Sequence, residues 1–505
     1  MSDRPDRKPL LFAAAALYSA GLVFFYIKYV PIVASFQAVL APVLAAVAIA
    51  AALNLERGIL AFLFCFPLIN GLPYVFGIGG STPHAPTALV LFLFFFLGYL
   101  IRAGFGLPKP PPRPGVAAPI LLLSGLVAAS ALITFWRYAN FAPLRSDRIY
   151  ELVANVNGVT AGGAVMSVVF SALSYLAGFA FFLILLRFVG REAFVAKALT
   201  TVLAGAALAV GFGLVQRFGD IRLGNTEAGC QAGALNATLK DPNSFGAYLC
   251  VVIPLALGAA LGLRGFRRLG SAALLLAAII VLPFSGSLIG WLGLLITVLV
   301  FSVTAVRSAF LRRREDPAAV RRVVGAAIAI VVLLSLVLAT VPAIRRSRSF
   351  VKIRTRISSM DAANDWGSLT SRRVDYFWRL AVRMMADFPL TGVGIGAYIV
   401  ELPNEAVLHR ARWRNADSAE NYGLQVGAEL GIPALALAVW IFWRIFLRSA
   451  RTWKASFGRD SPRYRTFMTA GCFAGLVSML AAFFFHTYLG SYEIILLFWF
   501  LAALP

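Results

Sequence analysis

The chain has 505 residues, of which 60% are hydrophobic and only 13% are charged. A soluble globular domain averages about 25% charged and about 45–50% apolar residues, so this composition excludes a soluble globular protein and indicates one solvated by lipid. The formal net charge of +24 is compatible with nucleic-acid binding or with retention of basic loops on the cytoplasmic side of a membrane. Because the arginines stand in short loops between apolar segments, without a nucleic-acid-binding motif, we expect retention and no nucleic-acid partner.

Apolar segments long enough to cross about 30 Å of hydrocarbon recur along the chain. They predict an all-α, polytopic bundle of about fourteen transmembrane helices. The predicted spans are 9–27, 31–53, 58–78, 85–101, 117–136, 162–186, 198–218, 243–263, 270–285, 287–306, 323–343, 422–443, 466–485 and 491–505. The first lacks a small-residue cleavage site, so we interpret it as a retained span. The four cysteines show no paired spacing, which predicts neither a disulfide framework nor a zinc site.

The basic residues of the short loops predict the orientation of the bundle. They precede the first span and follow the fourth, sixth, eighth, tenth and twelfth spans. All of these loops fall on one side if the N-terminus is cytoplasmic, because Lys and Arg in short loops stay inside. The pattern therefore predicts an even number of spans with both termini cytoplasmic.

Three segments on the other side, 137–161, 219–242 and 344–421, are longer than a turn requires, and loops of this length usually carry function. The last one holds thirteen Lys and Arg against eight Asp and Glu. A loop longer than about 60 residues can be translocated despite its charge. Cytoplasmic retention therefore does not explain these arginines.

Within that loop, "SRRVDYFWRLAVRMMADFPLTGVGIGAY" (371–398) has helical periodicity. The apolar positions are Val374, Phe377, Trp378, Ala381, Met384 and Met385, with Arg372, Arg373, Arg379 and Arg383 interleaved. We predict an amphipathic helix on the outer membrane surface, ended by Pro389 and a glycine-rich turn. Its arginines bind either anionic headgroups or the phosphates of a substrate, for which Arg372 and Arg373 are the leading candidates. The "GVGIG" turn does not follow a strand, so we do not expect it to bind a nucleotide.

A second polar motif, "LKDPNSFGAYL" (239–249), enters the eighth span. Pro242 interrupts the preceding chain, and Asn243 or Ser244 is predicted to cap the new helix, whose N-terminus favours anions. Arg222 and Lys240 add positive charge near this helix start. Capping alone is the alternative interpretation.

A third motif, "NADSAENYGLQVGAELG" (415–431), places Asp417, Glu420 and Asn421 before an apolar segment that contains Glu429. His409 precedes it in the same loop. An ionisable residue within a span is a candidate functional residue; the alternative for Glu429 is a buried carboxylate paired with a polar neighbour. For Glu420 the alternative is an exposed residue or a carboxylate near the positive end of a helix.

The order of these motifs resembles that of the O-antigen ligase and polymerase superfamily of membrane glycosyltransferases, over residues 200–445. The matching features are Asp241–Pro242–Asn243, then Arg372 and Arg373 followed by "FPLTGVGIG", and then Asn421, Leu424, Glu429 and Gly431. The resemblance implies a GT-C-like fold and transfer of a glycan from an undecaprenyl-diphosphate-linked oligosaccharide to the hydroxyl of a glycan or lipid acceptor, with no metal or other cofactor. It further implies the bacterial inner membrane, a periplasmic active site, contacts with membrane lipids, and partners from polysaccharide assembly.

The sequence departs from the family pattern at two places. Glu420 stands where the family has a histidine, and "PFSGSLIG" (283–290) lacks an arginine common there. We therefore hypothesise that Glu420 accepts the proton of the acceptor hydroxyl, that Asn421 holds the local turn or the sugar, and that Arg372 and Arg373 receive the diphosphate.

The missing histidine favours a polymerase slightly over a ligase. Two other functions stay open: a transporter or flippase of lipid-linked sugars, and a non-catalytic membrane sensor or scaffold. In domain terms we expect a single integral membrane domain, 1–505, with the periplasmic loop 344–421 inserted late in the chain.

Overall fold

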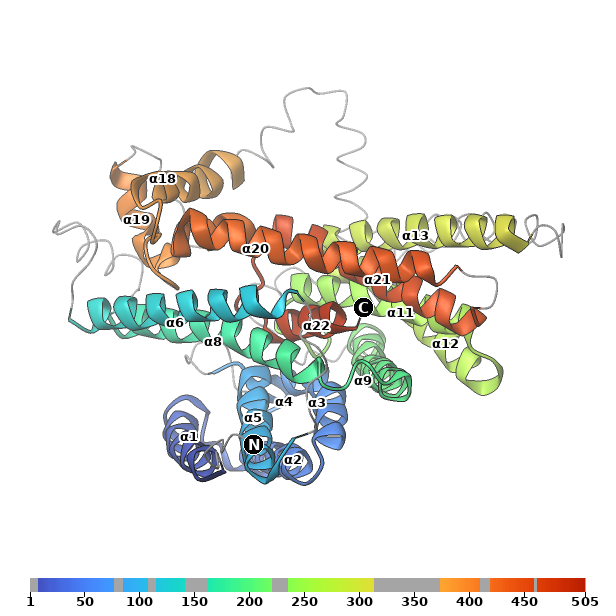
Figure 1. Cartoon of the computed structure of the whole chain (residues 1–505), viewed down its shortest axis with the longest axis horizontal. Helices are drawn as coiled ribbons and strands as arrows, with labels where there is room; N and C mark the ends of the chain where they lie inside the picture. The colour runs from blue at the N-terminus through green and yellow to red at the C-terminus, as the bar shows by residue number, and fades with distance from the viewer. Residues whose placement is uncertain are drawn as a thin grey trace, which may run out of the picture.

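The computed structural model describes residues 8–76, 85–107, 115–140, 161–219, 235–312, 373–408, 418–457 and 461–504. Every regular element in these ranges is a helix (Figure 1). Eleven of the described helices are long and apolar enough to cross a membrane. The predicted all-α, polytopic fold is therefore confirmed.

The helices follow one another with short breaks. The N-terminal part contains α1 (Lys8–Tyr29), α2 (Ala34–Leu53), α3 (Leu55–Ile69), α4 (Leu72–Val75), α5 (Thr87–Phe105), α6 (Ala117–Ala139), α8 (Ala161–Leu185) and α9 (Glu192–Phe218). The middle contains α11 (Pro242–Gly262), α12 (Gly265–Val281), the 3-10 turn η1 (Leu282–Ser285) and α13 (Leu288–Arg312). The C-terminal part contains the π-helical turn η2 (Arg373–Trp378), α18 (Arg379–Asp387), α19 (Tyr398–Leu408), α20 (Tyr422–Ala455), α21 (Arg463–Phe485) and α22 (Tyr492–Ala503).

One predicted span, 58–78, is divided into α3 and α4 by a break at Asn70. The side chain of Asn70 explains the break, because its Oδ1 accepts from the amide of Ala88 (2.9 Å) and its Nδ2 donates to Glu493 Oε2 (2.6 Å). The predicted span 323–343 lies outside the described residues. Each of the other predicted spans falls on a described helix.

Helix α11 forms the centre of the bundle, buried along most of its length against α12, α13 and α21. Small residues permit this packing: a Cβ atom on Gly258 would lie 2.5 Å from the carbonyl oxygen of Phe467, and one on Gly471 would lie 2.6 Å from that of Pro254. Close backbone approach at glycines is typical of helix pairs in membranes.

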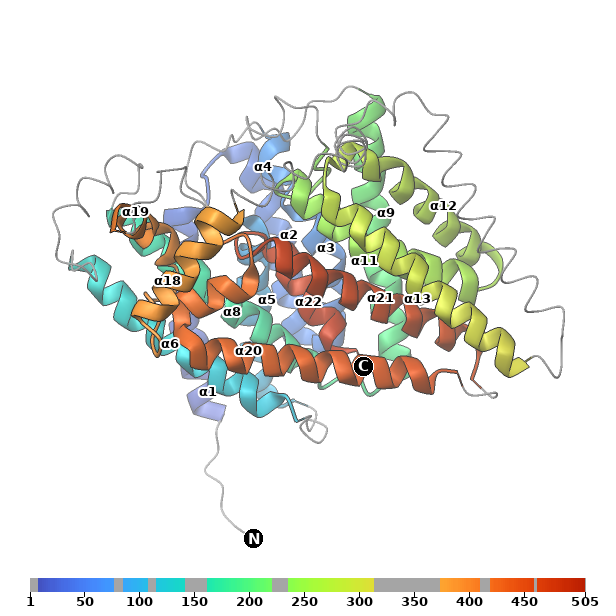
Figure 2. The same ribbon diagram turned by 90° about the horizontal axis from the view of Figure 1, so that it is seen from above.

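The bundle has two ends, which we name by what they carry. The motif face is the end where α11, α20 and α22 begin and where α6, α9 and α21 end; the opposite face is the other end of these helices. Helices α18 and α19 lie beside the motif-face ends of α6 and α8 (Figures 1 and 2). On the opposite face, Glu56 forms ion pairs with Arg191 (3.1 Å) and Lys197 (3.3 Å). Arg191 and Lys197, which belong to one predicted cytoplasmic loop, thus lie beside the first turn of α3.

Candidate functional site

The amphipathic segment of the long loop packs on protein. Leu380, Ala381 and Met384 of α18 are buried, and the helix contacts α20. The contact is close because α20 has a glycine there: a Cβ atom on Gly427 would lie 2.3 Å from the sulfur of Met385. Helical periodicity was therefore a correct guide to the helix, but the prediction that its apolar face lies on the membrane surface was wrong.

Arg379 and Arg383 are exposed on α18. Because residues four apart lie on the same helical face, the two guanidinium groups extend from one side of α18. That side faces away from α20, since the buried residues occupy the other side. Arg373 begins η2, and its side chain lies outside what the structure describes, as does all of Arg372.

Helix α20 is kinked at Gly431, which has φ 84° and ψ 173°. The kink frees backbone groups, and the glycine-rich turn after α18 binds them. The amide of Val393 donates to the carbonyl oxygen of Ala428 (2.8 Å), and the amide of Gly394 donates to the carbonyl oxygen of Glu429 (3.0 Å). In the other direction, the amide of Ile432 donates to the carbonyl oxygen of Pro389 (2.8 Å). The turn and the first part of α20 thus form one hydrogen-bonded unit.

The glycines of this turn are required by close packing against three helices. The three glycines, Gly392, Gly394 and Gly396, have positive φ. A Cβ atom added to Gly392 would lie 2.4 Å from the backbone of Glu429 in α20, and one added to Gly394 would lie 2.3 Å from Thr134 Oγ1 in α6. A Cβ atom added to Gly396 would lie 2.5 Å from the carbonyl oxygen of Ser167 in α8. The amides of the turn bind protein groups as well, including that of Ile395, which donates to Ser130 Oγ (3.0 Å). The turn is a packing element joining α6, α8 and α20.

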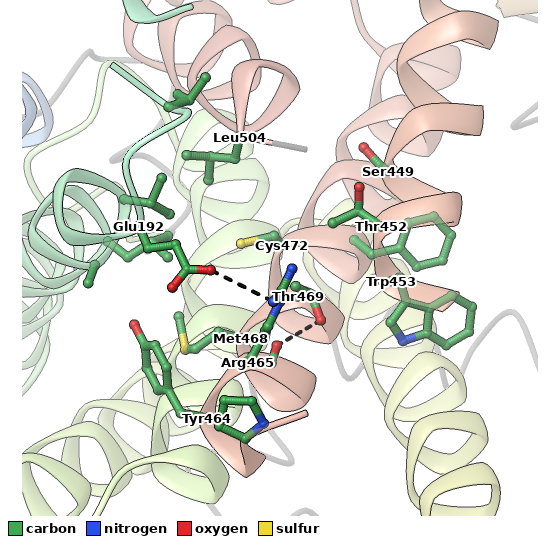
Figure 3. A pocket seen from close by; sticks show the side chains of 16 residues that line it. Glu192, Ser449, Thr452, Trp453, Tyr464, Arg465, Met468, Thr469, Cys472 and Leu504 are labelled. Carbon is green, nitrogen blue, oxygen red and sulfur yellow. Dashed lines mark hydrogen bonds and ion pairs between the residues drawn. The ribbon is translucent and has the colours of Figure 1, made fainter. Parts of the chain in front are cut away.

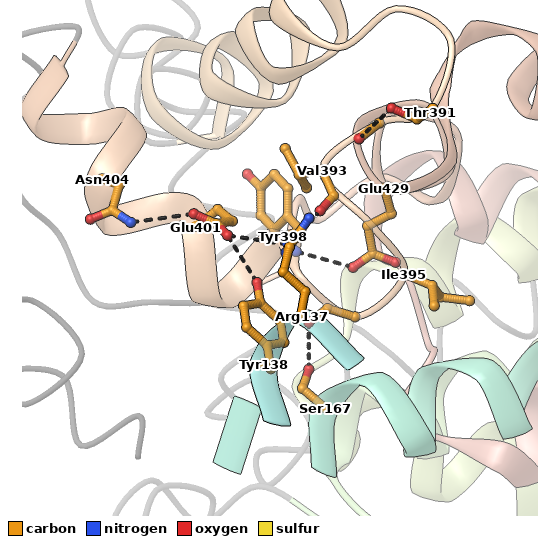
Figure 4. Close-up of polar contacts among 12 residues, drawn as sticks. Arg137, Tyr138, Ser167, Thr391, Val393, Ile395, Tyr398, Glu401, Asn404 and Glu429 are labelled. Carbon is orange, nitrogen blue, oxygen red and sulfur yellow. Dashed lines mark hydrogen bonds and ion pairs between the residues drawn. The ribbon is translucent and has the colours of Figure 1, made fainter. Parts of the chain in front are cut away.

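Glu429 is buried beneath this turn, with 1% of its surface exposed. Its Oε1 accepts from Gln425 Nε2 (2.7 Å) and from the amide of Tyr398 (3.4 Å), as Figure 4 shows for the second contact. The carboxylate therefore bridges α20 to the start of α19. This arrangement fits the paired, buried carboxylate that the sequence left open as the alternative.

A second carboxylate, Glu401, connects α19 to α6 (Figure 4). Its Oε1 accepts from Tyr138 OH (3.0 Å) and from Arg137 Nη2 (3.4 Å), and Arg137 also donates to the carbonyl oxygen of Val393 (2.9 Å). Asn404 Nδ2 donates to the other oxygen of Glu401 (3.3 Å). The sequence analysis did not predict this cluster. The available signal was Arg137, a basic residue at the span end that is predicted to be periplasmic, where cytoplasmic retention of basic loops predicts no basic residue.

Asn421 caps α20. Its Oδ1 accepts from the amide of Leu424 (2.9 Å), and its Nδ2 donates to the carbonyl oxygen of Phe484 at the end of α21 (3.0 Å). Glu420 precedes it with a φ of 50°, a left-handed conformation that costs a residue with a side chain about 1 kcal/mol or more. The side chain of Glu420 is partly exposed, whereas Ala419 and Asn421 on either side of it are buried. The turn therefore presents the carboxylate at the surface of the motif face.

At the start of α11 the capping residue is Asp241. Its Oδ1 accepts from the amides of Asn243 (2.8 Å) and Ser244 (2.9 Å). The prediction of Asn243 or Ser244 as the cap was wrong by two or three positions. The reason is that Pro242 takes the first helical position, where its missing N–H costs nothing. Asn243 is exposed in the first turn of the helix.

Lys240 lies beside this cap and contacts α22 and the connector before it. Its Nζ donates to the carbonyl oxygen of Gly490 (3.2 Å), and its amide donates to the buried carboxylate of Glu493 (3.4 Å). The hydroxyl groups of Ser244 and Ser491 are 2.7 Å apart. The lysine side chain is exposed, so part of its ammonium group faces outward.

The two polar motifs meet at the connector 484–491 between α21 and α22. Asn421 binds one end of it at Phe484, while Lys240 and Ser244 bind the other end at Gly490 and Ser491. The ring of Trp378, at the end of η2, also packs on Phe484, with ring centroids 5.5 Å apart. Three segments distant in sequence therefore converge on the motif face.

His486 occupies the middle of this connector. Its Nδ1 accepts from the amide of Tyr488 (3.3 Å), and the two rings stack with centroids 4.5 Å apart. The structure brings it between the two motifs.

Four predicted site residues, Arg222, Arg372, His409 and Asp417, lie outside the described residues. Among those described, no three His, Cys, Asp or Glu side chains gather as metal ligands do.

The comparison with protein families identifies part of the chain. The family model described as O-antigen ligase matches residues 272–439. The matched segment runs from α12 through the glycine-rich turn, Glu420 and the kink at Gly431. This match confirms the resemblance stated from the motifs. A comparison with curated proteins gives no match.

Proposed function

We propose that this chain, which matches the family model described as O-antigen ligase over residues 272–439, transfers a glycan from an undecaprenyl-diphosphate-linked donor to an acceptor hydroxyl. The observation that carries the proposal is that Lys240 and Asn421, the residue next to Glu420, bind the two ends of the connector 484–491. A cationic group and a carboxylate on one face are the two charges that such a transfer needs.

The reaction is a displacement at the anomeric carbon of the donor sugar. The acceptor oxygen forms a bond to this carbon, and the bond from the carbon to the diphosphate oxygen breaks. The diphosphate leaves with the electron pair, and the hydroxyl proton passes to the carboxylate of Glu420, which acts as general base. This role for Glu420 is supported by its partial exposure and by Asn421, which caps the helix that follows it.

The leaving diphosphate gains negative charge as the bond breaks. Fixed cationic groups stabilise that charge without reorganisation. The position of Lys240 on the motif face supports this role, and Arg372, Arg373 and Arg222 are proposed to add guanidinium groups, which bind phosphate bidentately. In this proposal the guanidinium and ammonium groups supply the positive charge, and the reaction uses no metal.

The remaining predicted residues take supporting roles. Asn421 and Glu429 position the turn and the start of α20 through their contacts with Phe484, Gln425 and Tyr398. Asn243, exposed at the start of α11, is proposed to contact the donor or acceptor, with Asp417 and His409 of the neighbouring loop. We place this site on the periplasmic side of the bacterial inner membrane, with both termini cytoplasmic.

The test uses the purified full chain with a lipid-linked repeat unit, with and without lipid A–core. Chain growth identifies a polymerase, which we favour slightly because Glu420 replaces the family histidine. A single transfer onto lipid A–core identifies a ligase. If neither product forms from a verified donor, the proposal fails, and the transporter and scaffold functions gain support.

A further inference from the structure

A cavity in the described structure lies on the opposite face, remote from the motifs. It is bounded by the first turns of α9 and α21, the last turns of α20 and the end of α22 (Figure 3). Its volume is about 370 Å³, which falls in the size range of small-molecule sites. Since the candidate active site is at the other ends of these helices, the cavity is a separate feature.

The walls of the cavity are mainly apolar. The aliphatic and aromatic side chains that form them are Val195, Leu199, Met468, Phe473 and Leu504. Trp453 forms one side, where it stacks on Phe473 with ring centroids 4.7 Å apart and donates from Nε1 to Thr304 Oγ1 (3.0 Å). Such walls fit a hydrocarbon chain, because the transfer of each CH₂ group from water to apolar surroundings is favourable.

The mouth of the cavity carries charge. Arg465 and Glu192 face each other across 3.7 Å, with 56% and 89% of their side chains exposed. An exposed ion pair at this distance contributes little to stability. The guanidinium group can therefore exchange this carboxylate for a phosphate, to which it binds bidentately.

We propose that this cavity binds a phosphate-headed membrane lipid, with one hydrocarbon chain against Trp453 and Leu199 and the phosphate at Arg465. The position agrees with this ligand, because the cavity lies at the ends of apolar helices, where lipid headgroups meet the chain. A membrane glycerophospholipid and a polyprenyl phosphate share this chemistry, and the experiment separates them.

The test measures quenching of Trp453 in the full-length protein in detergent. Phosphatidylglycerol with brominated chains is titrated into the wild-type chain and into Trp453→Phe, and the difference isolates the signal of Trp453. We expect saturable quenching that Arg465→Gln weakens about tenfold, which corresponds to ~1.4 kcal/mol. Arg463→Gln, an exposed arginine two positions away that does not line the cavity, is the matched control and should bind as the wild type does.

Two further measurements make the result decisive. Ala196→Phe fills the cavity from α9 and should abolish the quenching, whereas Ala193→Phe, exposed in the same helix, should not. Brominated diacylglycerol, which lacks the phosphate, should quench at least tenfold more weakly. Unchanged quenching in Ala196→Phe, or equal quenching by diacylglycerol, would overturn the proposal.

Competition with unlabelled lipid then identifies the source of the phosphate. Displacement by polyprenyl phosphate at lower concentrations than by phosphatidylglycerol assigns the cavity to a carrier lipid, and the reverse order assigns it to a membrane phospholipid. Because the readout is binding, it does not depend on glycan transfer, and failure of the proposed function leaves the result intact.

Discussion

At the scale of single residues, Glu420 combines a left-handed backbone (φ 50°) with a partly exposed carboxylate between buried neighbours. Non-glycine residues held in this conformation cluster at functional sites, where the surrounding structure compensates for the strain. Asn421 provides such compensation, since it caps α20 and binds the end of α21. The left-handed conformation of Glu420 therefore favours a functional role for its side chain.

Glu420→Gln removes the proton acceptor while keeping the shape of the side chain. We expect glycan transfer to fall by about 100-fold or more, with an unchanged unfolding midpoint, measured by product formation and by thermal unfolding in detergent. Glu420→Asp, which keeps the carboxylate, should retain part of the activity.

Glu420→Gly separates strain from function. Glycine adopts a φ of 50° without steric cost, so we expect an unfolding midpoint at or above that of the wild type, together with loss of transfer. A gain in both stability and transfer would mean that the carboxylate has no catalytic role.

At the scale of elements, the glycine-rich turn and the start of α20 act as one unit, since the kink at Gly431 exposes backbone groups that the turn binds. The packing of this unit against α6 is tight at Gly394, where an added Cβ atom would lie 2.3 Å from Thr134 Oγ1. The φ of Gly394 is 106°, a conformation that residues with a side chain rarely adopt. The unit connects the long loop to α6 and α8.

Gly394→Ala should therefore destabilise the protein by about 2 kcal/mol or more, measured as the free energy of unfolding in detergent. Gly125→Ala is the matched control, because Gly125 lies in α6 with no atom within 4 Å of an added Cβ. It should be neutral or stabilise by up to about 1 kcal/mol. Equal effects of the two substitutions would contradict the packing role of the turn.

The cap of α20 offers a second test at this scale. Asn421→Ala should cost about 1 kcal/mol of stability, since the amide of Leu424 loses its acceptor. Asn421→Asp keeps the acceptor for the amide of Leu424, but it no longer donates to the carbonyl oxygen of Phe484, which should itself cost some stability. We expect reduced transfer in Asn421→Asp, and wild-type transfer there would show that the contact with the connector is dispensable.

At the scale of the whole molecule, the motif face and the opposite face differ in what they carry. Asp241, Glu420 and the helices α18 and α19 lie on the first, and the ion pairs of Glu56 lie on the second. If short basic loops stay inside, the motif face is periplasmic.

Cysteine labelling in intact cells tests this orientation in a chain whose native cysteines are replaced. Leu390, 75% exposed in the turn on the motif face, and Phe266, 86% exposed at the start of α12, are suitable positions. We expect a membrane-impermeant maleimide to label Leu390→Cys in intact spheroplasts and Phe266→Cys only after permeabilisation. The reverse pattern would place the motifs in the cytoplasm and exclude a periplasmic reaction.

The sequence predicted the helices of the bundle well because hydropathy is a local property, and each described span could be read from its own residues. Local patterns also located the turn after Pro389 and the start of α11 to within a few residues. They did not reveal the pairing of Arg137 with Glu401 or the packing of α18 on α20, because both depend on residues far apart in the chain. The meeting of Asn421 and Lys240 at one connector was unpredictable for the same reason.

That connector sets a limit on molecular size. Phe484 and Gly490, to which Asn421 and Lys240 are bound, are six residues apart, and a polypeptide covers at most about 3.6 Å per residue. These two residues, the anchor points of Asn421 and Lys240, are thus separated by no more than about 22 Å in any conformation of the bundle. If the proposed transfer takes place here, a donor that contacts both anchor points has its phosphates and its reacting sugar no further apart than roughly this distance.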